Sequence, residues 1–408
     1  MTQEVMQALQ YELSIPRYLV ARGLTKLQPH RFHAWISPLH LRAVPIPDLP
    51  GPEWVRIRTE ACGICGSDLN ALRGAESFSM EPYASFPCVM GHEIIGRVVA
   101  CGKQANGIAE GTRVAVENVL PCAPRGITPP CAACAAGNYS LCANFANGHL
   151  APGVLIGFTK GLGGGWGEFC VAHKSQLFPV PGDIPTRDAV LIDSLASALQ
   201  PVADHFPPDD ATVLVYGAGI IGLNVIQCLR AAGSRARIIA IGRHAFQADW
   251  ATRLGASEVI TRNLFPTIAD LTSATIRKPT LGPPVLDGGV DHVFDCVGTP
   301  QTIDYSMRFV RKRGTVVVVG TAGLLSKVDA SPLWFKEVRL TGSAMFSHST
   351  IGGIRKRTYQ HVIDLMAGGK LRADGLVTHQ FPIAEYAKAL TTALDKKRHQ
   401  GIKVAFEF

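Results

Sequence analysis

Two short stretches of the chain carry residue types that bind metal ions. Cys65 lies in the segment Gly63–Asp68, and His92 lies in the segment Pro87–Glu93. A thiolate and an imidazole are typical ligands of catalytic zinc, which takes three protein ligands and keeps a fourth position open for water or substrate. We therefore expect Cys65 and His92 to hold such a zinc ion, with a third ligand from a distant part of the chain.

Four further cysteines, Cys122, Cys131, Cys134 and Cys142, have a spacing typical of a metal site. Eight residues separate the first pair, two separate the middle pair and seven separate the last pair. Four thiolates fill a tetrahedral site completely, so a zinc ion bound there is structural. The N-terminus does not resemble a secretory signal, and this favours metal ligation over disulfide bonds.

A glycine-rich motif, Gly217-Ala218-Gly219-Ile220-Ile221-Gly222, follows an apolar β-type run and precedes a helix-like segment. In this context the pattern predicts a dinucleotide site. Gly217 allows a tight turn, Gly219 lets the backbone approach the pyrophosphate, and Gly222 lets the helix pack against the strand. The helix N-terminus then offers N–H groups and partial positive charge to the phosphates.

The residues after the next predicted strand, Ile238–Ile241, indicate which dinucleotide binds. In NAD sites an Asp or Glu at this strand end accepts a hydrogen bond from the ribose 2′-hydroxyl. Here Gly242 takes that place, and Arg243 and His244 follow. Glycine leaves room for a 2′-phosphate, and a guanidinium can bind the phosphate with two hydrogen bonds. We therefore predict a preference for NADP(H) over NAD(H); the alternative is an Arg243 that points to solvent and a pocket that does not discriminate.

The length of 408 residues suggests two domains, and the sequence pattern changes once along the chain. From Glu60 to Val180 short β-type runs are separated by glycines, which predicts an irregular, mostly antiparallel β domain. From Thr212 strand and helix signals alternate, which predicts a doubly wound parallel sheet. Residues 1–50 are interpreted as an extension with one or two early strands. The last predicted elements are helices over Ile351–Met366 and Ile383–Leu394 and a strand over Ile402–Phe408.

The net charge of +8 suits an anionic cofactor. The tightest basic cluster, Arg311–Arg313, lacks the interleaved aromatic residues of nucleic-acid sites and is interpreted as a solvated face. No apolar run reaches the ~18 residues that span a bilayer. We therefore expect a cytoplasmic protein that binds neither nucleic acid nor membranes.

These motifs, in this order, resemble those of the zinc-dependent medium-chain alcohol dehydrogenases. The resemblance extends from about Val55 to Phe408, although the family has a shorter first gap in its four-cysteine lobe. It implies an α/β protein with an irregular, β-rich GroES-like catalytic domain and a Rossmann domain built on a doubly wound parallel sheet. The catalytic domain would span 1–200 and 345–408, including the lobe at 118–145, and the Rossmann domain would span 201–344.

The resemblance also implies roles for single residues. Asp193, inside an apolar run, matches the third zinc ligand, which is a carboxylate in branches similar to sorbitol, glucose and threonine dehydrogenases; the alternative is a helix N-cap. Ser67 would bind the substrate hydroxyl and start a proton relay. Asp68 would orient His92, and Glu93 can approach the zinc as a transient or fourth ligand.

The function implied by the resemblance is hydride transfer between NADP(H) and an alcohol, ketone or aldehyde. The loop that contains Cys296 and Val297 would face this cofactor, and two zinc ions per chain and a homodimer or homotetramer are expected. Two alternatives are a zinc-containing reductase of a specialised or conjugated carbonyl in a biosynthetic pathway, and a cofactor-binding protein without turnover.

Overall fold

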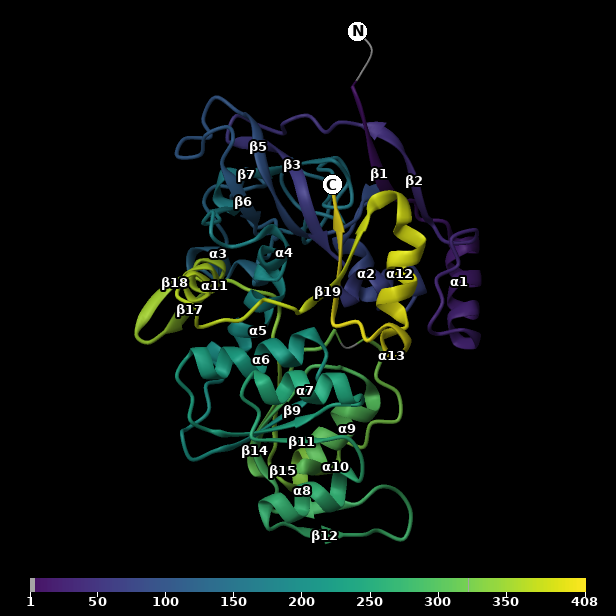
Figure 1. The fold of residues 1–408 in the computed structure, drawn as a ribbon, viewed down its shortest axis with the longest axis vertical. Helices are drawn as coiled ribbons and strands as arrows, with labels where there is room; N and C mark the ends of the chain where they lie inside the picture. The colour runs from purple at the N-terminus through teal and green to yellow at the C-terminus, as the bar shows by residue number, and fades with distance from the viewer. Residues whose placement is uncertain (1–3, 322) are drawn as a thin grey trace. The chain divides into compact units, whose positions relative to one another are not determined.

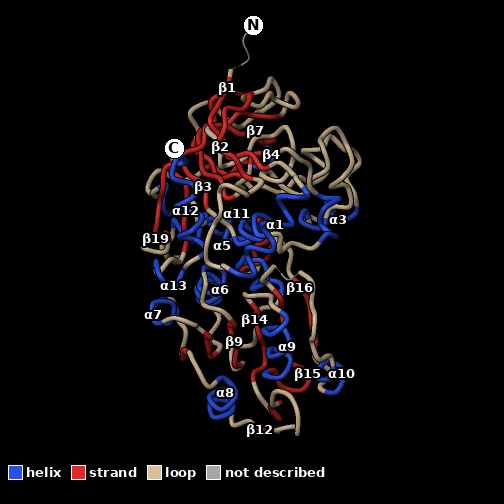
Figure 2. The backbone as a smooth tube through the Cα atoms, turned by 90° about the vertical axis from the view of Figure 1, so that its right-hand side faces the viewer, coloured by secondary structure: helices blue, strands red, loops and turns tan. Residues whose placement is uncertain are grey.

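The computed structural model describes residues 4–321 and 323–408, which form two compact units. The first unit combines the chain up to Asp193 with Ala373–Phe408, and the second comprises Ser194–Arg372. Figure 1 labels the elements of both units, and Figure 2 distinguishes their helices from their strands. The irregular, β-rich character expected of the first part and the alternating character expected of the second are both confirmed.

A seven-stranded sheet forms the centre of the first unit. Its strand order is β19-β20-β3-β5-β6-β8, with β7 paired to β3, and every pair except β19–β20 is antiparallel. The core beside it includes fully buried Trp54, Trp166 and Phe406. The strands are β3 (Trp54–Gly63), β5 (Glu93–Cys101), β6 (Arg113–Val116), β7 (Phe169–His173), β8 (Leu177–Pro179), β19 (Val377–Pro382) and β20 (Lys403–Glu407). After residue 50 the helices of this unit are α2 (Gly66–Arg73), α3 (Ala132–Ala135), α4 (Thr186–Ala189), α12 (Tyr386–Leu394) and α13 (Lys396–His399), with 3-10 turns η1 (Phe78–Tyr83), η2 (Tyr139–Leu141), η3 (Lys174–Gln176) and η4 (Ile383–Glu385).

The described part of the first fifty residues packs as part of this unit. Strand β1 (Val5–Tyr11) pairs antiparallel with β2 (Leu39–Pro45) and with β4 (Cys88–Val89). The expected early strands are therefore present, and one of them contacts the segment that leads to His92. Between them lies a helix that the sequence analysis did not predict, α1 (Ile15–Leu27), which packs beside α2 (Figure 1).

The second unit is built on a parallel sheet of six strands in the order β11-β10-β9-β14-β15-β16. This order, with strands added outward on both sides of β9, is that of a doubly wound sheet. The strands are β9 (Thr212–Tyr216), β10 (Arg237–Ile241), β11 (Glu258–Ile260), β14 (Val290–Asp295), β15 (Val310–Val318) and β16 (Arg339–Gly342), and a small hairpin joins β12 (Thr275–Arg277) to β13 (Val285–Asp287). The helices are α5 (Ile192–Asp204), α6 (Ile220–Ala231), α7 (Ala245–Arg253), α8 (Leu264–Thr272), α9 (Pro300–Phe309), α10 (Ser331–Phe335) and α11 (Thr358–Ala367).

The helix predicted over Ile351–Met366 is only partly present. Its first part is instead a hairpin of β17 (His348–Ile351) and β18 (Ile354–Arg357), and α11 begins only at Thr358. Gly352 and Gly353 have φ values of +56° and +80°, which are typical of a tight two-residue hairpin turn. The preference of the two glycines for a turn therefore overrides the helix predicted from the surrounding apolar residues.

One buried glutamine explains why this hairpin belongs to the second unit. Gln200 of α5 accepts hydrogen bonds from the Ser347 N–H at 2.9 Å and the Thr358 hydroxyl at 2.7 Å. It also donates to the His348 carbonyl at 3.3 Å. Residues up to Arg372 consequently pack with the parallel sheet, whereas the expected catalytic domain resumes at residue 345.

Candidate active site

Cys65 lies at the junction between β3 and α2. It is the N-cap residue of α2, and its backbone N–H donates to Oδ2 of Asp68 at 2.9 Å. Asp68 is completely buried. The local sequence therefore fixes the direction of Cys65 by capping the helix that follows it.

His92 and Glu93 stand at the start of β5, beside two glycines that allow close packing: Gly91 against Trp166 and Gly63 against Glu93. Gly91 has a φ of +87°, and a Cβ atom there would lie 2.2 Å from Cδ1 of Trp166. Gly63 pairs with Glu93 across the β3–β5 ladder, and a Cβ atom on Gly63 would lie 1.8 Å from Oε2 of Glu93. Only glycine at position 63 leaves room for the Glu93 carboxylate beside Cys65.

Cys65, His92 and Glu93 offer ligand atoms that all lie within 4.8 Å of one another. A thiolate, an imidazole and a carboxylate form a donor set that suits zinc. Nδ1 of His92 lies 3.3 Å from Oδ1 of Asp68, the carboxylate–histidine arrangement that orients metal-binding imidazoles. Burial opposes protonation of His92, but the Asp68 carboxylate and the Cys65 side chain outweigh it and raise the pKa of this histidine. The chemistry and spacing of these residues therefore fit a zinc site.

Lys403 is a buried partner of this group that the sequence analysis did not identify. Its Nζ forms an ion pair with Oε2 of Glu93, and both side chains are only 2% exposed. Burial lowers the pKa of Lys403, but Glu93 outweighs this effect, so the pKa is raised. The only sequence signal was a single basic residue within the apolar closing strand. Its pairing became visible because β20 lies next to β3.

Asp193, the predicted third ligand, lies in the first turn of α5 and is 7% exposed. It is outside the group of ligand atoms that lie within 4.8 Å of one another. Nδ2 of Asn118 donates to Oδ2 of Asp193 at 2.7 Å and to the His92 carbonyl at 3.1 Å. Asn118 thus links the two residues, and the assignment of Asp193 as a zinc ligand stays a prediction. Ser67, for which a relay role is expected, is half-buried on the first turn of α2.

The four-cysteine lobe is brought together in full. The thiol groups of Cys122, Cys131, Cys134 and Cys142 all lie within 4.8 Å of one another, so the longer first gap does not remove Cys122 from the group. The Cys131 N–H and the Asn144 side-chain amide both donate to the Cys122 sulfur, at 3.3 and 3.2 Å. Donors of this kind stabilise thiolates, and the set fits a structural zinc.

A buried arginine holds the enlarged first turn of this lobe. Arg125 is 1% exposed, and Nε and Nη1 donate to the carbonyls of Leu120 and Asn147, each at 2.9 Å. Further donors reach the carbonyls of Leu150, Ala151 and Gly153. The guanidinium therefore ties both ends of the lobe together with its own hydrogen bonds.

The glycine motif of the second unit has the geometry expected of a dinucleotide site. Gly217 has a φ of +101°, and a Cβ atom there would lie 2.4 Å from Cγ2 of Val297. A Cβ on Gly222 would lie 1.8 Å from the Gly217 carbonyl oxygen. Gly219 is the N-cap of α6, and a Cβ there would meet no described atom within 4 Å. The tight turn, the close helix packing and an open backbone approach are thus all present, with Ile220 and Ile221 forming the first turn of α6.

The loop of Cys296 and Val297 adjoins this motif and is fixed by a buried carboxylate. Asp295 Oδ1 accepts from the N–H groups of Val297 at 3.0 Å and Gly298 at 3.1 Å, and its Oδ2 accepts from the Thr302 hydroxyl at 2.8 Å. Burial nevertheless raises the pKa of Asp295. At the end of β10, Gly242 is buried, Arg243 is exposed, and the His244 ring stacks on Phe246 at 5.5 Å.

Family comparisons match both halves of the chain. The alcohol dehydrogenase GroES-like domain matches residues 51–182, and the zinc-binding dehydrogenase domain matches residues 221–368. An erythritol/L-threitol dehydrogenase of Mycolicibacterium smegmatis is 29% identical over 86% of this chain and 89% of its own length. The starvation-sensing protein RspB of Escherichia coli is 26% identical over 86% of this chain and 91% of its own length.

Solved structures share the fold over the whole chain. A structure described as a zinc-binding dehydrogenase from Sinorhizobium meliloti bound to NADP is 26% identical, with a TM-score of 0.73 and coverage of 100% of both chains. The RspB structure from E. coli in complex with NADH is 22% identical, with a TM-score of 0.74 and coverage of 99% of both chains. Among the described residues, no helix combines the length and apolar character needed to cross a bilayer.

Proposed function

Because the chain belongs to the zinc-dependent alcohol dehydrogenases of the medium-chain family, we propose that it transfers a hydride between NADP(H) and an alcohol, ketone or aldehyde in the cytoplasm. The observation that carries the proposal is the buried group of Cys65, His92 and Glu93, with Asp68 and Lys403 behind it. A protein that only binds a cofactor has no need of such a group.

The residues of this group have distinct tasks in the proposed reaction. Cys65 and His92 would hold a zinc ion together with a carboxylate, which is Glu93 on the observed spacing or Asp193 on the family resemblance. When bound, zinc lowers the pKa of an alcohol and polarises a carbonyl. Asp68 fixes the orientation of His92, and Ser67 would accept the hydroxyl proton of the substrate and pass it towards solvent.

The charges around Glu93 affect whether its carboxylate is available to bind zinc. Nζ of Lys403 forms an ion pair with Oε2 of Glu93 in a region where both side chains are shielded from water, so each charge is compensated by the other. A second carboxylate at Asp193 lies on the other side of Asn118. Comparing the zinc affinity of Glu93→Gln and Asp193→Asn distinguishes the two candidates, because loss of the ligand should weaken zinc binding more than loss of the carboxylate behind it.

The direct test of the function is catalysis with a panel of substrates. Relatives of this chain are named dehydrogenases of erythritol, L-threitol and D-arabinitol, so the panel should contain short polyols as well as simple alcohols and ketones. We expect turnover of the cofactor, followed by its absorbance, that is lost in Cys65→Ser. Absence of turnover with every alcohol and carbonyl in zinc-loaded protein would favour a binding role instead.

The cofactor preference is tested separately from catalysis. The lack of a carboxylate at the end of β10, the nearby Arg243 guanidinium and the NADP complex of the S. meliloti relative support a preference for NADP(H). We expect Arg243→Glu to raise the KM for NADPH about tenfold or more while leaving that for NADH nearly unchanged. Arg253→Glu, the same charge change at the exposed end of α7, should leave both KM values unaltered. If Arg243→Glu keeps the wild-type preference between NADPH and NADH, Arg243 does not determine that preference.

A homodimer or homotetramer is also part of the proposal. Strand β16 is an edge strand of the six-stranded sheet, and Trp334 and Phe335 of the neighbouring α10 are 72% and 65% exposed. Exposed edges and aromatic side chains are features of association surfaces. Light scattering of wild type and Trp334→Ser tests whether this edge is used.

A further inference from the structure

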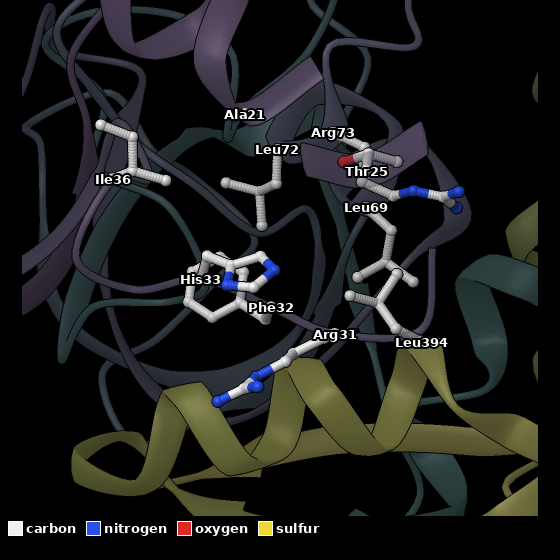
Figure 3. A pocket seen from close by; sticks show the side chains of 10 residues that line it. All are labelled: Ala21, Thr25, Arg31, Phe32, His33, Ile36, Leu69, Leu72, Arg73 and Leu394. Carbon is white, nitrogen blue, oxygen red and sulfur yellow. The ribbon is translucent and has the colours of Figure 1, made fainter. Parts of the chain in front are cut away.

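A small pocket lies between α1, α2 and the segment that follows α1, with the end of α12 beside it (Figure 3). Three basic side chains line it: Arg31 and His33 from the segment after α1, and Arg73 from the last turn of α2. Of the lining residues that the structure describes, none is an Asp or Glu. The pocket therefore brings together basic groups from two parts of the chain without a carboxylate between them.

Two of these side chains have buried nitrogen atoms that lack an acceptor. Nε of Arg73 and Nε2 of His33 are buried, and neither has a hydrogen-bond partner in the described part of the chain. Burial lowers the pKa of the half-buried Arg73, and no neighbouring carboxylate opposes this effect. A guanidinium keeps its proton in proteins, so its charge stays in the pocket. A charge that is shielded from water and has no counter-charge is costly.

The acidic residues closest to Arg73 in sequence do not neutralise it. Asp68 of α2 is turned to the Cys65 N–H and to Nδ1 of His92. Burial, and then Asp68, raises the pKa of Glu76 to about 7, and Arg73 is not among the charges that act on it. Within residues 4–321 and 323–408, the Arg73 guanidinium consequently has no counter-ion.

The position of Arg73 at a helix end does not explain its buried Nε. A cation in the last turn of a helix is favourable because carbonyl groups point outward there. The Gly74 N–H, however, already donates to the carbonyls of Ala71 and Asn70. Nε of Arg73 donates to no described carbonyl. The side chain is therefore free to bind a ligand.

We propose that this pocket binds a small organic carboxylate. Two carboxylate oxygens in one plane suit the donor geometry of a guanidinium, and they can also accept from Nε2 of His33. Arg31, which is exposed at the edge of the pocket, adds a second positive charge. The walls formed by Phe32, Leu69 and Leu72 are apolar and suit a short hydrocarbon chain.

Two other occupants fit the pocket less well. A phosphate has further oxygens that need polar partners, and the walls formed by Phe32, Leu72 and Leu394 offer none. A water molecule could bridge Nε of Arg73 and Nε2 of His33, but it would leave the guanidinium charge uncompensated. A carboxylate with an apolar body satisfies both the charge and the walls.

The pocket is separate from the candidate zinc ligands, although it shares a helix with one of them. Arg73 lies at one end of α2 and Cys65 caps the other, and a helix of eight residues is about 12 Å long. Neither Cys65 nor His92 nor Glu93 lines the pocket. A ligand held here would lie outside the catalytic group, so the inference does not depend on the proposed hydride transfer.

Saturation-transfer NMR of the full chain with butyrate tests the proposal. We expect saturable binding with a dissociation constant on the order of 1 mM, and at least about tenfold weaker binding of butyramide and of inorganic phosphate. Arg73→Met should weaken butyrate binding at least about tenfold, and His33→Phe at least about threefold. Arg262→Met replaces an exposed arginine of the second unit, and this matched control should bind like wild type.

Folding and the candidate zinc site are controlled separately. Arg73→Met removes an uncompensated charge, so its unfolding temperature without ligand should equal or exceed that of wild type. Carboxylates also bind zinc, so Cys65→Ser is measured in parallel and should retain butyrate binding. Retention of binding in Arg73→Met would overturn the proposal, as would its loss in Cys65→Ser, absence of binding to wild type, or equal binding of butyrate and phosphate.

Discussion

At the scale of single residues, the candidate site depends on buried polar groups that orient one another. Asp68 caps Cys65 through the backbone and faces His92 through its second oxygen. Lys403 neutralises Glu93 from a strand near the C-terminus. Each of these contacts lies in a region shielded from water, where an unpaired charge is costly. The side chains behind the zinc ligands are therefore expected to influence metal binding almost as strongly as the ligands themselves.

Replacing Asp68 by Asn tests this expectation. The substitution keeps the size of the side chain but removes the carboxylate that orients His92 and makes its imidazole a more basic ligand, so we expect zinc affinity and kcat/KM to fall about 10- to 100-fold. Chelator competition and steady-state kinetics measure the two effects. Asp183→Asn, on the exposed surface, is the control. Unchanged zinc retention in Asp68→Asn would show that His92 is positioned by other contacts.

At the scale of elements, two buried cations hold segments by binding carbonyl groups. Arg125 joins the ends of the four-cysteine lobe, and Lys336 donates to the carbonyls of Arg308 and Val310 where α9 ends. Carbonyl oxygens at a helix end lack partners within the helix, and a cation stabilises them. Both cations are therefore expected to contribute to stability rather than to catalysis.

We expect Arg125→Met to loosen the lobe. The substitution leaves buried carbonyls without donors, at a cost of about 1–3 kcal/mol for each group that water cannot reach. Zinc release to a colorimetric chelator should become faster, and the midpoint of thermal unfolding should fall. Arg125→Lys keeps the charge but loses the forked geometry, so it should give an intermediate result. Release at the wild-type rate in both variants would contradict the role of the guanidinium.

The buried Lys336 side chain leads us to predict that the free energy of unfolding depends on pH. Burial lowers the pKa of Lys336 to about 8. Since the unfolded chain keeps this proton up to a pKa of about 10.4, the unfolded state binds more protons between these values, and folding stability should rise with pH there. Urea unfolding at pH 7.5 and 9.5 should show wild type gaining stability relative to Lys336→Met. A difference that stays constant between the two pH values would refute the assignment.

At the scale of the whole molecule, two groups of candidate metal ligands, different in kind, belong to the same unit. The group at Cys65 includes a histidine and a carboxylate, whereas the lobe offers four thiolates that leave no open position. Zinc bound at the group of Cys65 could therefore take part in catalysis, whereas zinc bound at the lobe could have only a structural role. The second unit contributes the glycine motif and the residues expected to bind the cofactor.

Elemental analysis should find two equivalents of zinc per chain. In Cys131→Ser we expect one equivalent and a lower unfolding temperature, because the lobe loses a ligand but the group at Cys65 does not. In Cys65→Ser we expect one equivalent, loss of turnover and an almost unchanged unfolding temperature. A single equivalent in the wild type would mean that one of the two groups does not bind zinc.

The sequence by itself determined the features that depend on residues close together in the chain. The Gly217–Gly222 turn and the spacing from Cys131 to Cys142 are local, so short-range geometry was sufficient to predict them. The structure decided the features that require strand pairing over long distances. Lys403 reaches Glu93 only because β20 pairs with β3, and Asn118 comes between His92 and Asp193 only through the folded sheet.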